Sequence, residues 1–339
     1  MNDQTADSEY RERLRNDAAA GNVIAERLLL LSSLMHDDLD EIEAVLTRCK
    51  DVRHKRFLEA ELQCFHAWPG SEPWHDLLRQ SAEAGHREAK IVVSLYHEWA
   101  RRTGMLPQDS PNDFSLETWN QWRAPDWTVV ISGNGLTVER SAEFAPRALI
   151  DYLRRLLGPA LRPSTVIDPD SGQSITHPLR INQSAQWPPE QLGWMGKLFE
   201  HRLAEAGQYA VATGEVPSLL HYRPGQRYEA HFDCIDSKIA ESEDGRAQGG
   251  PRTLTILLAM GNDDYKGGET WFPRLRQGAK AATGELLRFN NTDDRGQPLR
   301  SSLHVGQVVT GGEKWLLSKW VRKYSTPYGR EICLTDSVN

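Results

Sequence analysis

The amino-acid sequence predicts an α+β protein, in which an all-α helical domain precedes an antiparallel β-sandwich or jelly roll with flanking helices. Residues 10 to about 100 carry apolar side chains at helical spacing, with no proline before Pro69. From Trp127 onward, short β-type runs alternate with glycine-rich turns, and helices followed by strands are typical of α+β folds. Of the 339 residues, 39% are hydrophobic and 26% are charged, so an ordinary core can be buried.

The helical part contains two similar segments, "NDAAAGNVIAERLLLL" and "RQSAEAGHREAKIVVSLY", with Gly85 lying 64 positions after Gly21. Alanine lets two helices approach closely, and glycine closes the turn between them. The pattern resembles Sel1-type or tetratricopeptide-type repeats, but an irregular helical bundle accounts for two copies equally well. The histidines of this region show no ligand spacing and are predicted to be surface or satisfied groups: His36, His54, His66, His75, His86 and His97.

We expect three parts: a helical domain over 1–105, a connecting segment over 106–126 and a β-rich domain over 127–339. Prolines, polar residues and tryptophans fill the connecting segment, and we expect its tryptophan-rich end, 119–127, to pack across the domains. Predicted strands include "WTVVIS", "VPSLLHY", "RTLTILLAM", "ETWFP", "GELLRFN" and "EKWLLSKWV". Helices are predicted at "AEFAPRALIDYLRRLLG" and "PPEQLGWMGKLFEHRLAEAG".

Composition excludes several classes of protein. The formal net charge of −7 argues against non-specific nucleic-acid binding, which needs a basic face. No apolar run approaches the roughly 20 residues that span a bilayer, so no membrane partner is expected. The polar N-terminus lacks the order of a signal peptide, and the four cysteines are far apart, as in reduced thiols. We therefore expect a cytoplasmic protein.

The stretch "GQRYEAHFDCIDS", residues 225–237, carries the first candidate metal ligands. In a strand, His231 and Asp233 point to the same face, and we expect Phe232 to face the core. A third ligand is expected from a later strand, where "SSLHVGQVV" places His304 inside an apolar run. Two histidines and one carboxylate leave open positions on a metal, as in non-haem Fe(II) oxygenases.

Lys314 lies ten residues after His304, in "GGEKWLLSKW", where a charge inside a strand needs a partner. A cation behind the metal can bind the far carboxylate of a dicarboxylic co-substrate whose keto-acid end chelates iron. A zinc hydrolase with the same triad is disfavoured, because it gives Lys314 no role.

The region from about Trp127 to Tyr324 resembles the catalytic domain of the prolyl 4-hydroxylase family of Fe(II)/2-oxoglutarate dioxygenases. The resemblance rests on "YRPGQRYEAHFD", "RTLTILLAMGNDDYKGGETWFP", "GELLRFNN" and "SLHVGQVVTGGEKWLLSKWVR", in that order. It covers roughly 200 residues and does not include the N-terminal helices. It implies that residues 127–339 form a double-stranded β-helix (jelly-roll) dioxygenase domain.

By this resemblance, His231, Asp233 and His304 are the catalytic iron ligands, and Lys314 binds the C5 carboxylate of 2-oxoglutarate. Tyr222 and Thr255 are expected in the co-substrate pocket. The sequence departs from the family at Ala259, where a tyrosine often provides a second anchor for the co-substrate.

The resemblance also implies hydroxylation of an unactivated C–H bond, with ascorbate supporting activity. We expect a free amino or imino acid such as proline or pipecolate as substrate, because Arg180, Arg252 and Arg322 can pair with an α-carboxylate. Trp271 is a further candidate substrate contact. One alternative is a prolyl residue of a peptide or protein, and a second is a non-catalytic interaction protein with helical repeats. Whether the chain forms a homodimer is left open.

Overall fold

The structure is a computed structural model that describes residues 3–35, 38–66, 73–102, 124–167, 174–176, 180–187, 193–261, 264–293 and 295–334. The chain divides into two compact units, which are described separately. The helical unit comprises 1–123, 188–200 and 331–339, and the β-rich unit comprises 124–187 and 201–330. Most of the expected connecting segment, 106–126, lies outside the described residues, so the predicted domain boundaries stay a prediction.

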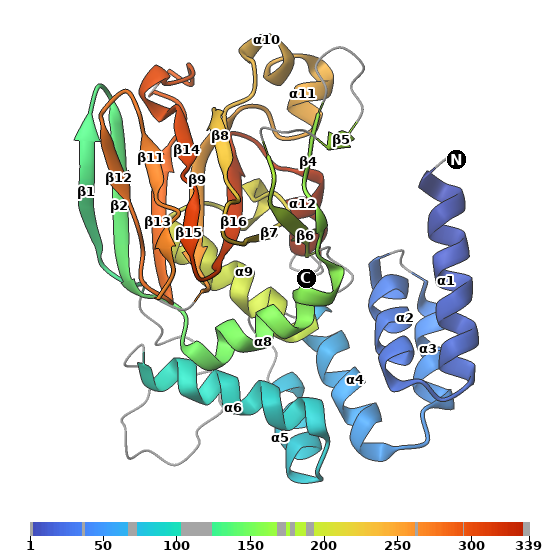
Figure 1. Ribbon diagram of the computed structural model, residues 1–339. Coiled ribbons are helices and arrows are strands. Elements are labelled where there is room, and N and C mark those ends of the chain that lie inside the picture. Colours follow the sequence, from blue (N-terminus) through green and yellow to red (C-terminus); the bar gives the residue numbers. More distant parts are fainter. Residues whose placement is uncertain are drawn as a thin grey trace. The chain divides into compact units, whose positions relative to one another are not determined.

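The described residues of the helical unit include six helices in its N-terminal part, which confirms the predicted helical region (Figure 1). They are α1 (Asp3–Ala19), α2 (Val23–Met35), α3 (Leu39–Arg48), α4 (Val52–His66), α5 (Pro73–Glu83) and α6 (Arg87–Arg102). No helix among the described residues has both the length and the apolar character that a membrane crossing requires.

The two similar segments of the sequence form the same turn between paired helices. Gly21 joins α1 to α2 with φ 85°, and Gly85 joins α5 to α6 with φ 97°. The amide of Gly21 donates to the carbonyl of Ala18 at 2.9 Å, and the amide of Gly85 donates to Ala82 at 3.0 Å. A positive φ at this place favours glycine, because a Cβ would strain the left-handed backbone.

The β-rich unit is built on an eight-stranded and a four-stranded antiparallel sheet. The eight-stranded sheet has the order β1-β2-β13-β9-β16-β7-β6-β3. Its strands are β1 (Trp127–Gly133), β2 (Leu136–Glu143), β3 (Arg162–Pro163), β6 (Gln183–Gln186), β7 (Ser218–Tyr222), β9 (Arg252–Ala259), β13 (Glu285–Asn290) and β16 (Lys314–Arg322). The four-stranded sheet, β12-β11-β14-β8, comprises β8 (Tyr228–His231), β11 (Thr270–Phe272), β12 (Gln277–Ala279) and β14 (His304–Gly306).

Two short hairpin-like pairs and several helices complete the described part of the chain. The paired strands are β4 (Thr165–Ile167) with β5 (Ser174–Thr176), and β10 (Lys266–Gly267) with β15 (Val309–Gly311). The helices are α8 (Arg147–Leu157), α9 (Gly193–Gly207), α10 (Ser237–Ala240), α11 (Glu243–Ala247), α12 (Pro327–Leu334) and the 3-10 turns η1 (Gly158–Ala160), η3 (Val211–Thr213) and η4 (Arg300–Ser302).

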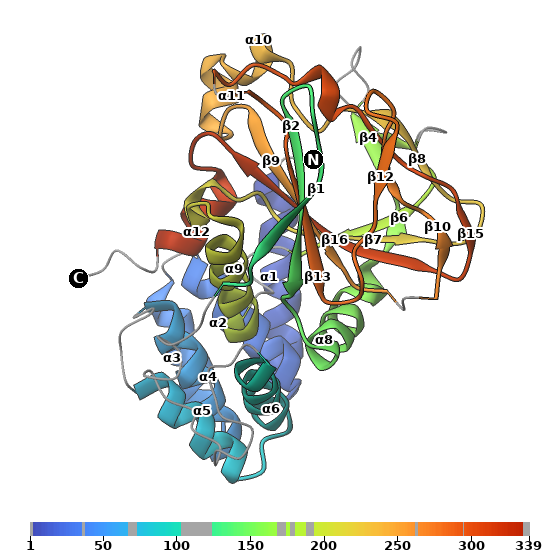
Figure 2. The ribbon, with the colours of Figure 1, turned by 90° about the vertical axis from the view of Figure 1, so that its left-hand side faces the viewer.

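The core of the β-rich unit lies between its two large sheets. Figure 2 shows β2 and β9 on one side and β12 and β8 on the other. Leu257 and Phe289 of the eight-stranded sheet share a buried cluster with Phe272 of the four-stranded sheet. Alternate residues of β9 face inward or outward, as strand geometry requires. Two facing antiparallel sheets confirm the predicted jelly roll.

Helical segments cover the outer face of the eight-stranded sheet. Ile256, which points outward from β9, approaches Gly207 at the end of α9. The indole nitrogen of Trp127 donates to the carbonyl of Ala206 at 2.9 Å. Of the tryptophan-rich segment 119–127, only Trp127 among its tryptophans lies within the described residues, so the predicted packing across domains stays a prediction.

Candidate metal and co-substrate site

Three predicted ligands converge at the inner face of the four-stranded sheet. His231 ends β8 and stands opposite His304, the first residue of β14, in an antiparallel pair. Asp233 follows two residues after His231. One ligand atom from each residue lies within 4.8 Å of the others. The Nε2 atoms of His231 and His304 are 3.6 and 3.7 Å from the carboxylate oxygens of Asp233.

Backbone carbonyls orient both imidazoles. The Nδ1 of His231 lies 2.7 Å from the carbonyl oxygen of Glu229, and the Nδ1 of His304 lies 2.9 Å from that of Ser302. A carbonyl only accepts, so each Nδ1 carries a proton, which leaves Nε2 as the ring nitrogen of each histidine that can bind a metal near Asp233. Burial and the neighbouring His304 hold the pKa of His231 well below its usual range. His231 is therefore neutral, the form that binds metals.

Thr255 and Asn291 fix the carboxylate of Asp233. The Thr255 hydroxyl donates to Oδ2 of Asp233 at 2.7 Å, and the Asn291 amide donates to that hydroxyl at 2.9 Å. Burial acts to raise the pKa of Asp233, but the two imidazoles and Thr255 outweigh it and lower the pKa. Asp233 is therefore anionic. Two imidazole nitrogens and one carboxylate oxygen fit Fe(II), with positions left for a co-substrate.

Phe232 lies between the two ligands in the sequence. We expected its side chain to face the core, and it does not. Its side chain is 41% exposed. The ligands point toward the eight-stranded sheet, so the residue between them points to the outer face of the four-stranded sheet. The prediction failed because it assumed that both faces of this strand are covered.

Lys314 presents a buried cation to the same space. It opens β16 and stands opposite Tyr222 of β7, with its ammonium 5.1 Å from the centre of the Tyr222 ring. The side chain is 3% exposed. Burial and the charge of Lys280 lower the pKa of Lys314 to about 8. Among the described residues no carboxylate forms an ion pair with it, so the site fits an anionic ligand.

A cavity that opens to solvent joins the ligands to Lys314. Its wall includes His231, Asp233, His304, Lys314, Tyr222 and Arg180. Tyr228 and Trp320 also line it. The Tyr228 ring is stacked on His231, with the ring centres 3.5 Å apart. The structure therefore brings together the three predicted ligands and two of the predicted co-substrate residues, Lys314 and Tyr222. Thr255, the third, acts on Asp233.

Only some of the predicted substrate contacts lie at the cavity. Arg180 lines the cavity, with its guanidinium 5.0 Å from the centre of the Tyr228 ring. Arg252 pairs with Glu215 through bonds of 2.6 and 2.8 Å, and Arg322 also donates to Glu215. Neither arginine lines the cavity.

Trp271 of β11 is not part of the cavity wall either. Ala259 stands opposite Leu316 in the β9–β16 ladder and is buried between the sheets. The substrate roles of Arg180, Arg252, Arg322 and Trp271 stay predictions.

Sequence reasoning missed Asn291 and Tyr228, which shape the site, and Glu215, which pairs with two of the predicted substrate contacts. Asn291 lies in the quoted motif "GELLRFNN", yet only the β13–β9 register shows that it reaches Thr255. Glu215 stands in no motif, and no pattern of spacing points to it.

Comparisons with known proteins agree with this geometry. The family model described as the 2OG-Fe(II) oxygenase superfamily matches residues 217–322, which hold the three ligands and Lys314. "Probable prolyl 4-hydroxylase 6" of Arabidopsis thaliana is 31% identical over 206 residues, which cover 55% of this chain and 69% of that protein. The chain belongs to the 2OG-Fe(II) oxygenase superfamily. This membership confirms the predicted family.

Two further likenesses have a similar extent. "Prolyl 4-hydroxylase 1" of Arabidopsis thaliana is 28% identical to this chain over 190 residues, 52% of this chain and 65% of that protein. A solved viral collagen prolyl hydroxylase, from Paramecium Bursaria Chlorella virus-1, has a TM-score of 0.41 and 22% identity, covering 55% of this chain and 95% of its own. This chain spans 58–65% of the length of the first curated relatives it matches. The superfamily uses Fe(II), 2-oxoglutarate and dioxygen, which the donor set and Lys314 fit.

Proposed function

We propose that this oxygenase hydroxylates a C–H bond of a prolyl residue within a peptide or protein, with Fe(II), 2-oxoglutarate and dioxygen. The observation that carries the reaction class is the ammonium of Lys314, which no carboxylate of the described residues pairs with and which lies on the wall of the cavity that holds the ligands. A buried cation without an anion is costly, and a dicarboxylic co-substrate removes that cost when it binds.

Two observations favour a peptidyl substrate over a free amino acid. The matched relatives are named prolyl 4-hydroxylases. In addition, the expectation of free proline or pipecolate depended on arginines that could pair with an α-carboxylate. Arg252 and Arg322 are already paired with Glu215, which leaves Arg180 as the one of the three on the cavity wall. An internal prolyl residue has no α-carboxylate and needs no such partner.

Each group of the site has a definite role in this reaction. His231 and His304 offer Nε2 lone pairs, while their Nδ1 protons remain on backbone carbonyls. Asp233 offers a carboxylate that Thr255 holds in one orientation. The bound iron, with 2-oxoglutarate and dioxygen, supplies the oxidation that converts C–H to C–OH and yields succinate and carbon dioxide.

The other walls of the cavity position the co-substrate and exclude water. Lys314 donates charge-assisted hydrogen bonds to the distal carboxylate, a contact stronger than one between neutral groups. Leu220, Leu257 and Leu316 supply apolar surface along the cavity. These groups keep competing water from the reacting C–H bond.

The test measures succinate release from purified protein with Fe(II), 2-oxoglutarate and a substrate panel. The panel compares free L-proline and L-pipecolate with prolyl peptides whose ends are both blocked. We expect turnover of blocked prolyl peptides, with hydroxyproline identified by mass spectrometry. Turnover of free amino acids alone would restore the small-molecule hypothesis, and no turnover of any substrate would favour a non-catalytic interaction protein.

A further inference from the structure

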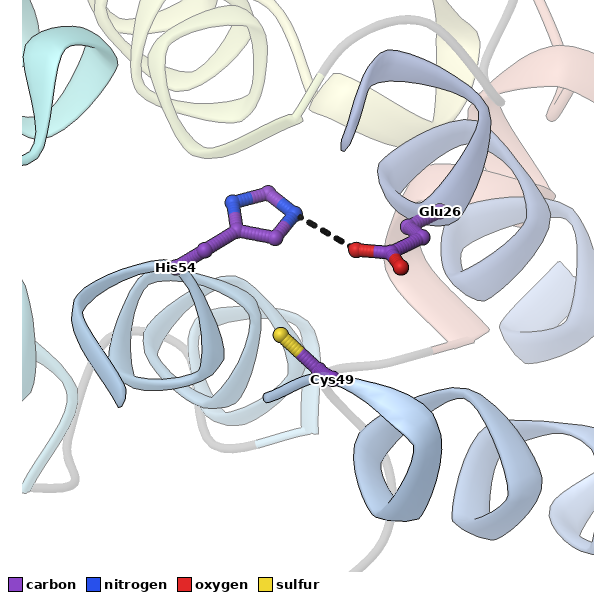
Figure 3. A group of neighbouring side chains, drawn as sticks. All are labelled: Glu26, Cys49 and His54. Carbon is purple, nitrogen blue, oxygen red and sulfur yellow. Dashed lines mark ion pairs between the residues drawn. The ribbon is translucent and has the colours of Figure 1, made fainter. Parts of the chain in front are cut away.

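The helical unit holds a second group of metal-ligating side chains. Glu26 lies on α2, Cys49 directly follows α3, and His54 lies on α4 (Figure 3). A carboxylate oxygen, the thiol sulfur and an imidazole nitrogen all lie within 4.8 Å of one another. Cys49 is 9% exposed and His54 is 4% exposed. Three successive helices therefore bring three different types of metal ligand together at a largely buried position.

The atom directed into this group is Nε2 of His54. It lies 3.3 Å from the Glu26 carboxylate, along the dashed line in Figure 3. This distance permits an ion pair, but the geometry forms no hydrogen bond, and the buried nitrogen has no hydrogen-bond partner elsewhere in the described chain. Buried polar atoms are normally satisfied. An unsatisfied imidazole nitrogen aimed at a carboxylate and a thiol marks a position for a cation.

A bound cation would counter the effect of burial on this group. Burial raises the pKa of Glu26 and the pKa of Cys49, so their surroundings disfavour both anions. The charge of Arg48 opposes the rise in the pKa of Glu26, but within the described part of the chain no lysine or arginine forms an ion pair with this carboxyl. A divalent cation favours both anions, and one thiolate with one carboxylate neutralises its charge.

We propose that Glu26, Cys49 and His54 form a metal site that binds Zn²⁺, with water as the fourth ligand. Thiolate and imidazole are typical zinc ligands, carboxylate is also accepted, and zinc prefers four ligands in a tetrahedron. By linking α2, the end of α3 and α4, the ion would hold successive helices of the unit together.

His86 determines which proton the metal must displace. The amide of Ala89 donates to Nδ1 of His86 at 3.1 Å, and Nε2 of His86 lies 3.0 Å from Nδ1 of His54. His86 therefore carries its proton on Nε2 and donates it to His54, whose own proton is on the Nε2 that faces Glu26. Metal entry moves that proton to Nδ1, which breaks the hydrogen bond from His86 to His54, and it removes the thiol proton of Cys49. Binding is therefore expected to tighten as the pH rises.

The test adds Co²⁺ to metal-free, full-length protein and records the near-ultraviolet spectrum. Sulfur ligation gives a thiolate-to-cobalt charge-transfer band, whereas the oxygenase triad offers only nitrogen and oxygen. We expect this band in wild type, its removal by one equivalent of Zn²⁺, and its loss in Cys49→Ser. Cys234→Ser is the matched control, because Cys234 adjoins Asp233 and is another free thiol. It should keep the band.

Two further variants separate this site from the proposed function. Glu26→Gln should weaken Zn²⁺ binding by about tenfold or more while keeping the thiolate band at saturation. His304→Ala should keep the band although it disables the oxygenase site. Absence of the band in wild type, or its persistence in Cys49→Ser, overturns the proposal. The wild-type spectrum decides even where a variant fails to fold, and no step requires turnover.

Discussion

The hydroxyl of Thr255 donates a 2.7 Å hydrogen bond to Oδ2 of Asp233, so a residue of the eight-stranded sheet holds a ligand that follows the four-stranded sheet. Because this hydroxyl gives its proton to Asp233, it accepts the 2.9 Å bond from Asn291. From the described residues, no hydrogen bond reaches Oδ1 of Asp233. One oxygen is thus fixed by protein, while the other remains available to a metal.

Thr255→Val keeps the shape of the side chain and removes this hydrogen bond. We expect the affinity for Fe(II) or Co²⁺ to fall by about 10–100-fold, because partners of metal ligands orient them. Metal titration of the purified variant measures the change. Thr253→Val on the same strand is the control, since that hydroxyl bonds to the Val321 carbonyl at 3.3 Å. Equal affinities in the two variants would contradict the role of Thr255.

His304→Ala removes one ligand and should abolish iron-dependent turnover, while the circular dichroism spectrum stays that of the wild type. His221→Ala is the matched control, because His221 stacks on Trp315, 3.9 Å away between ring centres, and is not in the cavity wall. This control should retain turnover. Wild-type activity in His304→Ala would show that the ligand set is wrong.

Lys314→Met removes the buried ammonium and should raise the KM for 2-oxoglutarate. A charge-assisted hydrogen bond contributes about 1.5–3 kcal/mol, which is roughly tenfold to a hundredfold. Iron affinity without co-substrate should change little. Lys266→Met, at an exposed position of β10, is the control and should leave the KM unchanged. An unaltered KM in Lys314→Met would point to another cation.

The pH dependence of co-substrate binding should report the lowered pKa of Lys314. Burial and Lys280 lower it to about 8, so the ammonium is present below that pH and is lost above it. Affinity for 2-oxoglutarate should therefore be constant below pH 8 and fall at higher pH, approaching about tenfold per unit. Lys280→Gln removes one cause of the shift and should move the midpoint upward. A midpoint that stays in place would exclude Lys314 as the titrating group.

Glu215→Gln should destabilise the fold, because it leaves Arg252 and Arg322 without their shared anion. Breaking a buried ion pair typically costs about 3–5 kcal/mol in the free energy of unfolding. Urea denaturation measures the loss, with Glu313→Gln at a half-exposed position as the control.

Low pH should also weaken the ion pairs of Glu215 with Arg252 and Arg322. Burial acts to raise the pKa of Glu215, but the two arginines outweigh burial and hold this pKa below its usual range. Its contribution is therefore present above the unfolded pKa of about 4.3 and is lost as the pH falls through the folded pKa. A wild type and a Glu215→Gln variant with the same acid sensitivity would contradict this pairing.

The approach of the three candidate metal ligands could be predicted in part from the sequence, because short strand spacing encodes the position of two of them. His231 and Asp233 are two positions apart, so they share a face of one strand. A lone imidazole or ammonium in an apolar run, as at His304 and Lys314, is costly to bury unless it binds a partner. Glu215 could not be predicted, because it meets Arg252 and Arg322 only after distant strands have paired. Because the sequence does not show that Glu215 pairs with Arg252 and Arg322, both arginines were available as candidate substrate contacts.

In the helical unit, too, the sequence predicts the local elements but does not predict which side chains meet. Its helices follow from apolar periodicity, and its two turns follow from Gly21 and Gly85. The approach of Glu26, Cys49 and His54 depends on the crossing of three helices, which periodicity does not encode. Sequence neighbours alone therefore predict His54 to be a surface or satisfied histidine.

The pairing of His231 with His304 restricts where the chain can change length. A one-residue shift of either strand would turn its imidazole to the opposite face of the sheet. An inserted residue between His231 and Asp233 would likewise turn one of these two side chains away from the other. By contrast, an insertion in the loop between β13 and β14, away from Asn291 and Ser302, does not alter this parity. Insertional variants should therefore survive in this loop and lose iron binding when the extra residue falls within β8 or β14.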